Sequence, residues 1–583
     1  MKTNVNWIAA CFLLCAISVT KVSASSPQLT TLLDDIWQYE LTTNPIMATR
    51  LGVHDYDDQL SDISPESLQR QNQQFRSFLD TLDNLDKTSL SQSEKISVIM
   101  QKYRLQNYVD QYNFNSHYMP LTSESSFHSS LAFLPRSIRF NSPKDYENYL
   151  SRLSKFPSYF SQQIAWMKKG IETGFVQPKS VLVGFENSVK AFVHDAPSDS
   201  LYYTPFKDLS DSPLTKEQQV SLKQQAKTII STKVFPAYQA FYDFLVKDYI
   251  PNSKQEVGAN SWKDGLAYYQ NRSNYYTTTS MSVEDIHQLG LEEVARIRDE
   301  MQLVLNTLDF DGDINEFIHF LRTDPQFYAK TPEELIKEAS YIAKQMDAKL
   351  PLLFNKLPRT PYGVEAVPDN IAPKYTTGRY IGPTRDNQPG FYWVNTYALD
   401  KRPLYALTAL TLHEAVPGHH LQISLSRELQ ELPEVRRYTY ISAFGEGWGL
   451  YSEFLGKEVG MYENPYHEFG RLSYEMWRAC RLVVDTGMHV KGWSRQQAID
   501  YMLENTALSE HNVRTEVDRY ISWPAQALSY KIGELTIKQL RQQAKSQLGD
   551  RFDLRAFHNA VLEHGSIPLS VLKINVEKFI QQN

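Results

Sequence analysis

The sequence has few cysteines, a small net charge and no long apolar run beyond its N-terminal region. Each of these features excludes a class of protein. Only three cysteines occur among 583 residues. Cys11 and Cys15 lie near the start, so a processed chain would keep Cys480 alone and form no internal disulfide. The net charge is −7 with no long basic segment, which argues against a nucleic-acid partner. Beyond the N-terminal region no run of 18 apolar residues occurs, so we expect no transmembrane segment after processing.

The N-terminus has the pattern of a secretory signal peptide. Lys2 gives a positive start, an apolar run covers residues 7–19, and Val22-Ser23-Ala24 fits a small-residue cleavage site. We therefore predict that residues 1–24 are removed and that the protein is exported, to the periplasm or as a secreted protein. An uncleaved anchor is the alternative. Lipoprotein anchoring through Cys11 is not favoured, because the apolar run before it is short and continues past it.

Helix signals dominate the remaining chain. Ser64-Pro65 and Thr331-Pro332 are helix starts, and Ser91 with Glu94 forms a capping box. Many amphipathic helices with short breaks predict a mostly α protein of helices packed on helices. A polar stretch at 270–282 suggests a division into an N-terminal helical half, residues 25–275, and a second half, residues 276–583, within one body over about residues 30–580.

One region departs from the helical pattern. Lys374–Tyr380 and Phe391–Asn395 are rich in aromatic and β-branched residues, and Pro383–Gly390 between them has the composition of a turn. We predict a small antiparallel hairpin here. Its exposed edge could pair with an extended peptide; a purely structural hairpin is the alternative.

Three of the 14 histidines fall within His413-Glu414-Ala415-Val416-Pro417-Gly418-His419-His420. Helical zinc sites use two histidines four residues apart, and here that position is Pro417. On a straight helix His419 and His420 would lie roughly 9 and 10 Å along the axis from His413. A bulge at Pro417-Gly418 would bring His419 back, since proline breaks the helical ladder and glycine accepts unusual angles. We predict His413 and His419 as ligands, with His420 as the alternative to His419.

Carboxylates complete the expected metal centre. Glu414 follows His413 directly and would act as general base towards water. Glu446 and Glu453 are seven residues apart and share a helix face, and the glycines around Glu446 allow close helix approach. We predict Glu446 as third ligand, Glu453 as a partner that orients a ligand, and one Zn²⁺ per chain as the cofactor.

With these motifs the chain resembles the bacterial domain-of-unknown-function 885 family, over about residue 30 to the C-terminus. That family is similar to helical zinc peptidases with a glutamate third ligand, namely thermostable carboxypeptidases, angiotensin-converting enzyme and neurolysin. The resemblance implies a large helical ellipsoid with a central channel and a small sheet beside the metal. The longer gap between the two histidines departs from those peptidases. The resemblance rests on His413–Gln422, Pro389–Tyr392 with Asn395, Glu446–Trp448 with Tyr451 and Glu453, Leu482–His489, Arg519-Tyr520, Trp523–Gln526 and Tyr530–Gly533.

The same resemblance implies residues that contact the reacting groups. The peptidases place a tyrosine and often a histidine opposite the zinc, where they donate hydrogen bonds to the developing oxyanion. Tyr530 and His511 are the candidates here, with Tyr520 behind them. Asn395 is a candidate for substrate binding.

Two arginines in the same region could hold a substrate carboxylate. Arg514 and Arg519 offer the fork geometry that binds a carboxylate through two hydrogen bonds. A structural ion pair with Glu516 or Asp518 is the alternative for each.

The leading interpretation is a zinc-dependent peptidase with a peptide substrate, of carboxypeptidase, dipeptidase or oligopeptidase type. A metal-dependent hydrolase of an ester or a non-peptide amide is one alternative, because the same water chemistry would serve it. A protein that binds peptides without cleaving them is another. The sequence does not specify the cleavage preference or the oligomeric state.

Overall fold

The computed structural model describes residues 26–369, 371–383 and 388–583. The predicted signal peptide and residues 384–387 of the predicted turn lie outside these ranges. The described residues are mostly helical, as predicted. Among them, no helix is both long and apolar enough to cross a membrane.

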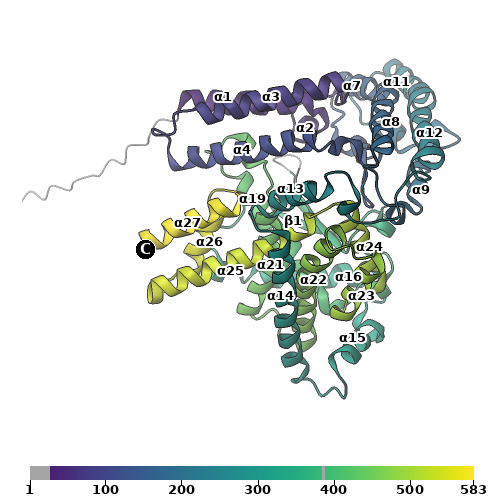
Figure 1. The fold of residues 1–583 in the computed structure, drawn as a ribbon. Helices are drawn as coiled ribbons and strands as arrows, with labels where there is room; N and C mark the ends of the chain where they lie inside the picture. Colours follow the sequence, from purple (N-terminus) through teal and green to yellow (C-terminus); the bar gives the residue numbers. More distant parts are fainter. Residues whose placement is uncertain (1–25, 370, 384–387) are drawn as a thin grey trace, which may run out of the picture.

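The first helices form a layer along one side of the molecule (Figure 1). The predicted caps set two of their starts: Ser64 accepts a hydrogen bond from the Ser67 amide, and Ser91 with Glu94 forms the capping box. The helices of this layer are α1 (Pro27–Thr43), α2 (Pro45–Arg50), α3 (Pro65–Asn84) and α4 (Gln92–Asn113).

A second group of helices, residues 127–244, lies at one end of this layer (Figure 1). Its core is aromatic, with Phe156, Tyr202 and Tyr238 fully buried. The group consists of α5 (Phe127–Leu131), α6 (Leu134–Ser137), α7 (Pro143–Ser154), α8 (Phe156–Thr173), α9 (Phe185–Lys190), α10 (Thr204–Lys207), α11 (Lys216–Ile229) and α12 (Phe235–Phe244).

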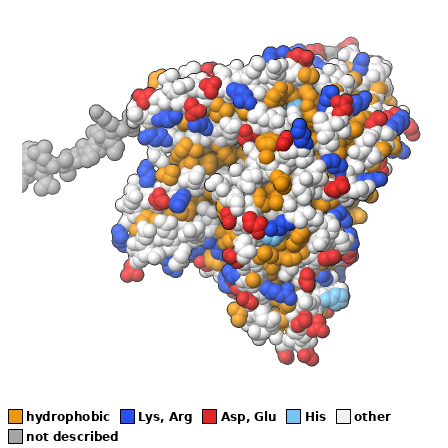
Figure 2. Space-filling view, in the orientation of Figure 1, with side chains coloured by type: hydrophobic (Ala, Val, Ile, Leu, Met, Phe, Trp, Pro, Cys, Tyr) orange, Lys and Arg blue, Asp and Glu red, His pale blue; other side chains and the backbone are white. Residues whose placement is uncertain are grey.

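The rest of the chain packs around two long helices, α14 (Val283–Leu305) and α22 (Pro465–His489). A Cβ atom on Gly290 would lie 2.7 Å from the Leu482 Cβ, so this glycine allows α14 to approach α22 closely. On the face in Figure 2, Lys and Arg side chains are interspersed with Asp and Glu. The other helices of this part are α13 (Gly265–Thr277), α15 (Ile314–Thr323), α16 (Pro332–Asp347), α17 (Leu350–Leu353), α18 (Leu407–Glu414), α19 (His419–Arg427), α20 (Glu434–Arg437), α21 (Ser442–Glu458), α23 (Arg495–Asn505), α24 (Glu510–Ser522), α25 (Ser529–Leu548), α26 (Leu554–Leu562) and α27 (Leu569–Gln582).

The polar stretch expected to mark a loose boundary is largely helix α13. Arg272 and Ser273 are buried there, and an Arg272 amino group donates to the Asn107 side chain of α4 at 2.7 Å. These residues are buried in a helix that contacts α4, so they do not form a linker. The largest apolar core includes Ile96 and Phe579, from the two ends of the chain. The division into two halves stays a prediction.

A three-stranded sheet contains the predicted hairpin. Strands β2 (Gly378–Ile381) and β3 (Gly390–Val394) are antiparallel, with Tyr380 opposite Tyr392. A third strand, β1 (Tyr362–Ala366), pairs parallel to β3, so the sheet is mixed and not purely antiparallel. Residues 374–377 were expected in the hairpin but are not strand: Lys374 ends a 3-10 helix, and the Asn395 side chain donates to the carbonyls of Tyr375 and Thr376. The strand order β1-β3-β2 leaves β2 at an edge.

Candidate metal centre

The chain breaks between α18 and α19. Helix α18 ends at Glu414, Ala415 has φ −91° and ψ −114°, and α19 begins at His419. A Cβ atom on Gly418 would lie 1.9 Å from the His413 carbonyl oxygen, so only glycine fits there. The Trp448 indole donates to the Pro417 carbonyl at 2.8 Å and holds the turn. Instead of the expected bulge within one helix, two helices meet at a turn, which brings His419 beside His413.

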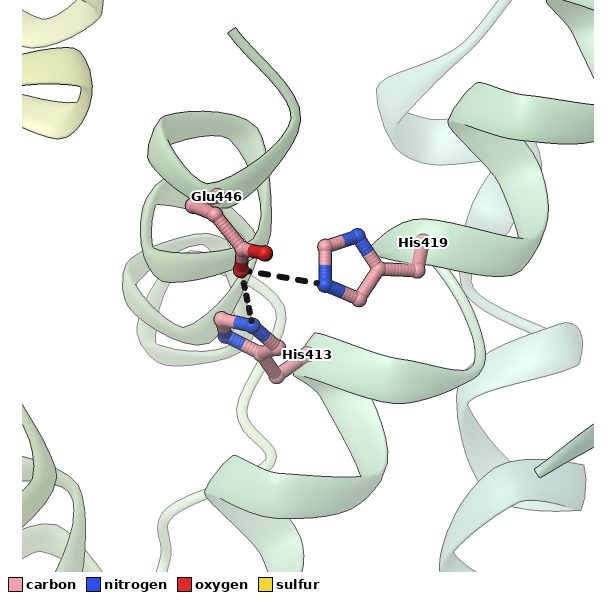
Figure 3. A group of neighbouring side chains, drawn as sticks. All are labelled: His413, His419 and Glu446. Carbon is pink, nitrogen blue, oxygen red and sulfur yellow. Dashed lines mark ion pairs between the residues drawn. The ribbon is translucent and has the colours of Figure 1, made fainter. Parts of the chain in front are cut away.

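The structure brings His413, His419 and Glu446 together (Figure 3). Glu446 Oε2 lies 3.5 Å from His413 Nε2 and 3.3 Å from His419 Nε2, and the three ligand atoms lie within 4.8 Å of one another. Ligand atoms bound to one tetrahedral zinc would be roughly 3.3–3.5 Å apart. The two distances to Glu446 match that spacing, and two imidazoles with one carboxylate are a zinc-type donor set.

The electrostatics of this cluster favour positive charge between the ligands. Burial opposes protonation of His413, but Glu446 and Glu453 outweigh it and raise its pKa to about 9. Burial also opposes ionisation of Glu446, yet His419 and His413 hold its pKa well below the usual range. A buried carboxylate beside two imidazoles is therefore best balanced by protons or by a cation.

Glu453 orients His413 from the side away from Glu446. Its Oε1 accepts from His413 Nδ1 at 2.8 Å and pairs with Arg478 at 3.1 Å. This hydrogen bond leaves Nε2 of His413 facing the cluster. A Cβ atom on Gly449 would lie 2.6 Å from the His413 ring, so this glycine allows α21 to approach the imidazole.

Glu414 is held by the edge strand. The Tyr380 amide donates to Glu414 Oε2 at 2.7 Å. Because this N–H is used by Glu414, it points away from β3, and the outer edge of β2, with one amide engaged by Glu414, faces the end of α18. The sequence contains no signal for this contact, which depends on how the sheet lies against the helix.

His420 lies outside the cluster. Its ring centroid is 4.5 Å from that of Tyr362, and its Nδ1 is 3.0 Å from the Tyr380 hydroxyl. Burial lowers its pKa to about 4, so it is neutral in the core. Of the two alternatives for the second ligand, the structure places His419 with His413 and Glu446.

Two tyrosines flank the cluster. The Tyr530 ring stacks on His413 with centroids 6.3 Å apart and planes inclined by 20°. Burial and, next, the Glu446 charge raise the pKa of Tyr530, so its phenol stays protonated. The Tyr440 hydroxyl donates to Glu446 Oε1 at 3.0 Å, which directs Oε2 to the histidines. Tyr440 was not predicted, because it precedes the recognisable motif.

Two other candidates lie away from the cluster. His511 is exposed at the start of α24, and the charges that act on it are those of Arg402, Lys401 and Asp400. Arg514 forms a surface ion pair with Glu510 at 2.6 Å, one helical turn away, and not with Glu516 or Asp518. Helix α24 turns these two side chains outwards, so the expectation that they contact substrate is not supported by their positions.

Three more candidates are buried in structural contacts. Arg519 pairs with Glu516 at 3.0 Å, which is the alternative considered for it. The Tyr520 hydroxyl accepts from Trp477 and Arg481, both at 2.8 Å. Asn395 donates to the carbonyls of Ala372, Tyr375 and Thr376 at 2.9–3.1 Å and so fixes the loop before β2. Their polar groups are engaged inside the fold.

The fold and the site together define a mostly helical protein with a buried His/His/Glu cluster at a helix break. The family model "Bacterial protein of unknown function (DUF885)" matches residues 45–576, and the chain belongs to this family.

Solved structures agree with this assignment. A protein described as "the putative lipoprotein from Colwellia psychrerythraea" is 31% identical with a TM-score of 0.87, and the match covers 95% of this chain and 99% of that one. A "putative lipoprotein of unknown function from Shewanella oneidensis" is 18% identical with a TM-score of 0.71, covers 94% of this chain and 99% of that one, and is similar in fold. No curated protein matches the chain.

Proposed function

We propose that this protein is a zinc-dependent peptidase. The observation that carries the proposal is the spacing of His413, His419 and Glu446, with Glu446 Oε2 at 3.5 and 3.3 Å from the two imidazoles, beside the carboxylate of Glu414. Spacing alone would also suit a structural zinc site. The adjacent Glu414, which the Tyr380 amide holds at a strand edge and which forms no ion pair with the described residues, favours a catalytic one.

His413, His419 and Glu446 would hold the ion. When bound, zinc would supply a Lewis acid that polarises a carbonyl and makes water more acidic. Glu453 keeps His413 in the tautomer with Nε2 towards the ion. The Tyr440 hydroxyl, on Glu446 Oε1, keeps that carboxylate presenting its other oxygen.

Proton transfer falls to Glu414. Its Oε2 accepts the Tyr380 amide, which fixes the carboxylate. The carboxylate can take a proton from the attacking water and return it to the leaving amine. Tyr530, stacked on His413, is the candidate that donates a hydrogen bond to the oxyanion.

A peptide is the favoured substrate because of the edge strand. The β2 edge faces the end of α18, and an extended peptide pairs with such an edge through main-chain hydrogen bonds. An ester or a non-peptide amide would gain nothing from this strand. The central channel implied by the family resemblance stays a prediction.

Export belongs to the same proposal. The predicted signal peptide and the description of the Colwellia protein as a lipoprotein both support it. We place the mature protein in the periplasm or outside the cell, with Ser25 as its first residue and Cys11 removed. Mass spectrometry of the mature N-terminus tests this: a lipidated Cys11 would contradict it.

The substitution Glu414→Gln tests the catalytic proposal. We expect the variant to keep zinc and to lose peptide hydrolysis by about 10²- to 10⁴-fold, the usual contribution of a general base. Glu333→Gln, at the exposed start of α16, is the control and should be fully active. Unchanged cleavage by Glu414→Gln would overturn the mechanism. Ester turnover without peptide cleavage would favour the ester hydrolase, and peptide binding without cleavage the binding protein.

A further inference from the structure

An arginine on the edge strand has a cationic group that the fold leaves only partly neutralised. Arg379 is 49% exposed, and its guanidinium lies 5.2 Å from the centre of the Tyr375 ring. Its ion-pair partner among the described residues is Glu124, at 3.9 Å. That distance exceeds the 2.7–2.9 Å of a charge-assisted hydrogen bond. Arg379 therefore keeps donors available for another anion.

Three other arginines around the site differ from Arg379 both in the exposure of the side chain and in the distance to a carboxylate partner. The side chains of Arg478, Arg481 and Arg519 are 4%, 3% and 7% exposed. Each has a carboxylate partner at 2.9–3.1 Å, which is Glu453 for the first and Glu516 for the other two. These three guanidinium groups are buried and held in short ion pairs, whereas that of Arg379 is exposed and has none.

Glu124 does not cancel the charge of Arg379. Arg519 lies 3.9 Å from its other oxygen, so two guanidinium groups share this carboxylate. Its Oε1 is buried without a hydrogen-bond partner. Arg379, Arg481 and Arg519 together face only two carboxylates among the described residues, Glu124 and Glu516, so the group carries one excess positive charge, and Arg379 is its exposed member.

Arg379 also lies close to the reacting groups. It precedes Tyr380, whose amide is 2.7 Å from Glu414 Oε2, and it is near enough to Glu414 for that carboxylate's charge to act on its guanidinium group. One peptide residue spans roughly 3.3–3.6 Å. Arg379 is the neighbour of the residue whose amide binds Glu414, so an anion bound by its side chain would lie within a few peptide residues of the bond that Glu414 serves.

We propose that Arg379 binds the C-terminal carboxylate of a peptide, so that cleavage releases one to a few residues from that end. This inference rests on the proposed peptidase function. The C-terminal carboxylate is the anionic group that every peptide carries at a fixed distance from its last bonds. An acidic side chain near the end offers the same chemistry, and the experiment separates the two.

Peptide binding tests the assignment directly. Three peptides of one sequence are compared by calorimetry on zinc-loaded mature Glu414→Gln protein: a free acid, its C-terminal amide, and an amide ending in glutamate. We expect the free acid to bind about 10- to 100-fold more tightly than either amide, as a hydrogen-bonded charge pair provides. Adding Arg379→Gln should remove the preference, and Arg379→Lys should keep part of it.

Arg514→Gln is the matched control, because its side chain forms a surface pair with Glu510; it should keep the full preference. Equal binding of acid and amide, or a preference that survives Arg379→Gln, overturns the assignment. Tight binding of the glutamate amide overturns the C-terminal specificity in favour of an acidic side chain. Thermal unfolding curves confirm that each variant is folded.

Cleavage by the zinc-loaded wild type separates this inference from the proposed function. If no peptide is cleaved while the preference depends on Arg379, the peptidase proposal fails and the carboxylate site stands. If acid and amide are cleaved with equal kcat/KM, the peptidase stands and the Arg379 assignment fails.

Discussion

Two regions between residues 276 and 583 bury charged groups, and they differ in how closely those groups are paired. The candidate metal centre on α18, α19 and α21 places two imidazoles near one carboxylate. The second region, on α14, α22 and α25, encloses Lys531, which is fully buried. Its ammonium group lies 2.7, 2.8 and 2.9 Å from Glu534, Glu475 and Glu293.

The difference lies in how completely each region satisfies its own groups. Around Lys531 every short distance is that of a formed ion pair, and Glu475 also binds Arg471 at 2.8 Å. In the candidate metal centre, Glu446 Oε2 lies 3.3 and 3.5 Å from the two imidazole nitrogens, and His419 Nδ1 is buried with no hydrogen-bond partner among the described residues. A closed network serves the fold, whereas a spaced one can receive a ligand. Buried charge by itself does not mark a functional site.

The sharpest test of this contrast is metal binding by histidine variants. His413→Ala and His419→Ala should each weaken zinc binding by more than about 100-fold, because even residues that only orient a ligand contribute 10- to 100-fold. His420→Ala is the control and should bind normally, since His420 packs against Tyr362. Metal analysis and chelator competition measure this. Loss of zinc in His420→Ala with retention in His419→Ala would contradict the ligand set.

Substitutions in the ion network of Lys531, Glu293, Glu475 and Glu534 should lower the free energy of unfolding and leave metal binding unchanged. Lys531→Met leaves three buried carboxylates without their shared cation, and we expect a loss of about 3–5 kcal/mol in the free energy of unfolding. Urea unfolding measures it. Lys538→Met, on the same helix but more exposed, should have a smaller effect. Full stability of Lys531→Met, or a weakened zinc site in a folded variant, would break the distinction between the two regions.

Glu453 links the metal centre to its surroundings. Glu453→Gln should weaken zinc binding about 10- to 100-fold, because the amide orients His413 less firmly than the carboxylate does. Chelator competition is the measurement. Glu458→Gln, further along α21, pairs with Arg541 and serves as control. Equal zinc affinity in both variants would show that Glu453 does not support the ligand.

Asp485 is a buried carboxyl that forms no ion pair with the described residues. Its Oδ1 accepts from the Tyr269 hydroxyl and the Ala525 amide. Burial raises its pKa from 3.8 to about 7. Because the folded state binds this proton more tightly than the unfolded state, its stabilisation is complete below pH 4 and is lost as the pH rises towards 7.

The slope from this single proton is at most about 1.4 kcal/mol per pH unit. Urea unfolding of the wild type and of Asp485→Asn between pH 4 and 7 measures it. The variant should lack that contribution to the slope. Identical slopes in both proteins would show that Asp485 is ionised throughout.

The features that sequence reasoning predicted well are local ones. The capping residues Ser64 and Ser91 start helices where expected, because a cap involves only the next three residues. The antiparallel pairing of β2 with β3 was also expected, since the two segments are close in sequence. The parallel strand β1 was missed, because nothing in Tyr362–Ala366 indicates a partner almost thirty residues away in the chain.

The sequence by itself determined the mostly helical class and the family, and it indicated the residues that gather at the centre: His413, Glu446, Glu453 and one of His419 and His420. Residue type and spacing carry that information, because ligand chemistry requires imidazole and carboxylate, and Pro417-Gly418 requires an interruption of the helix. Which charged groups face solvent or substrate was decided only by the tertiary structure. Arg514, Arg519 and Arg379 are the same residue type, yet a surface pair, a buried pair and an edge-strand position give them three different roles. Burial and partners arise from contacts between distant segments, and these depend on how α24, the sheet and the N-terminal half come together.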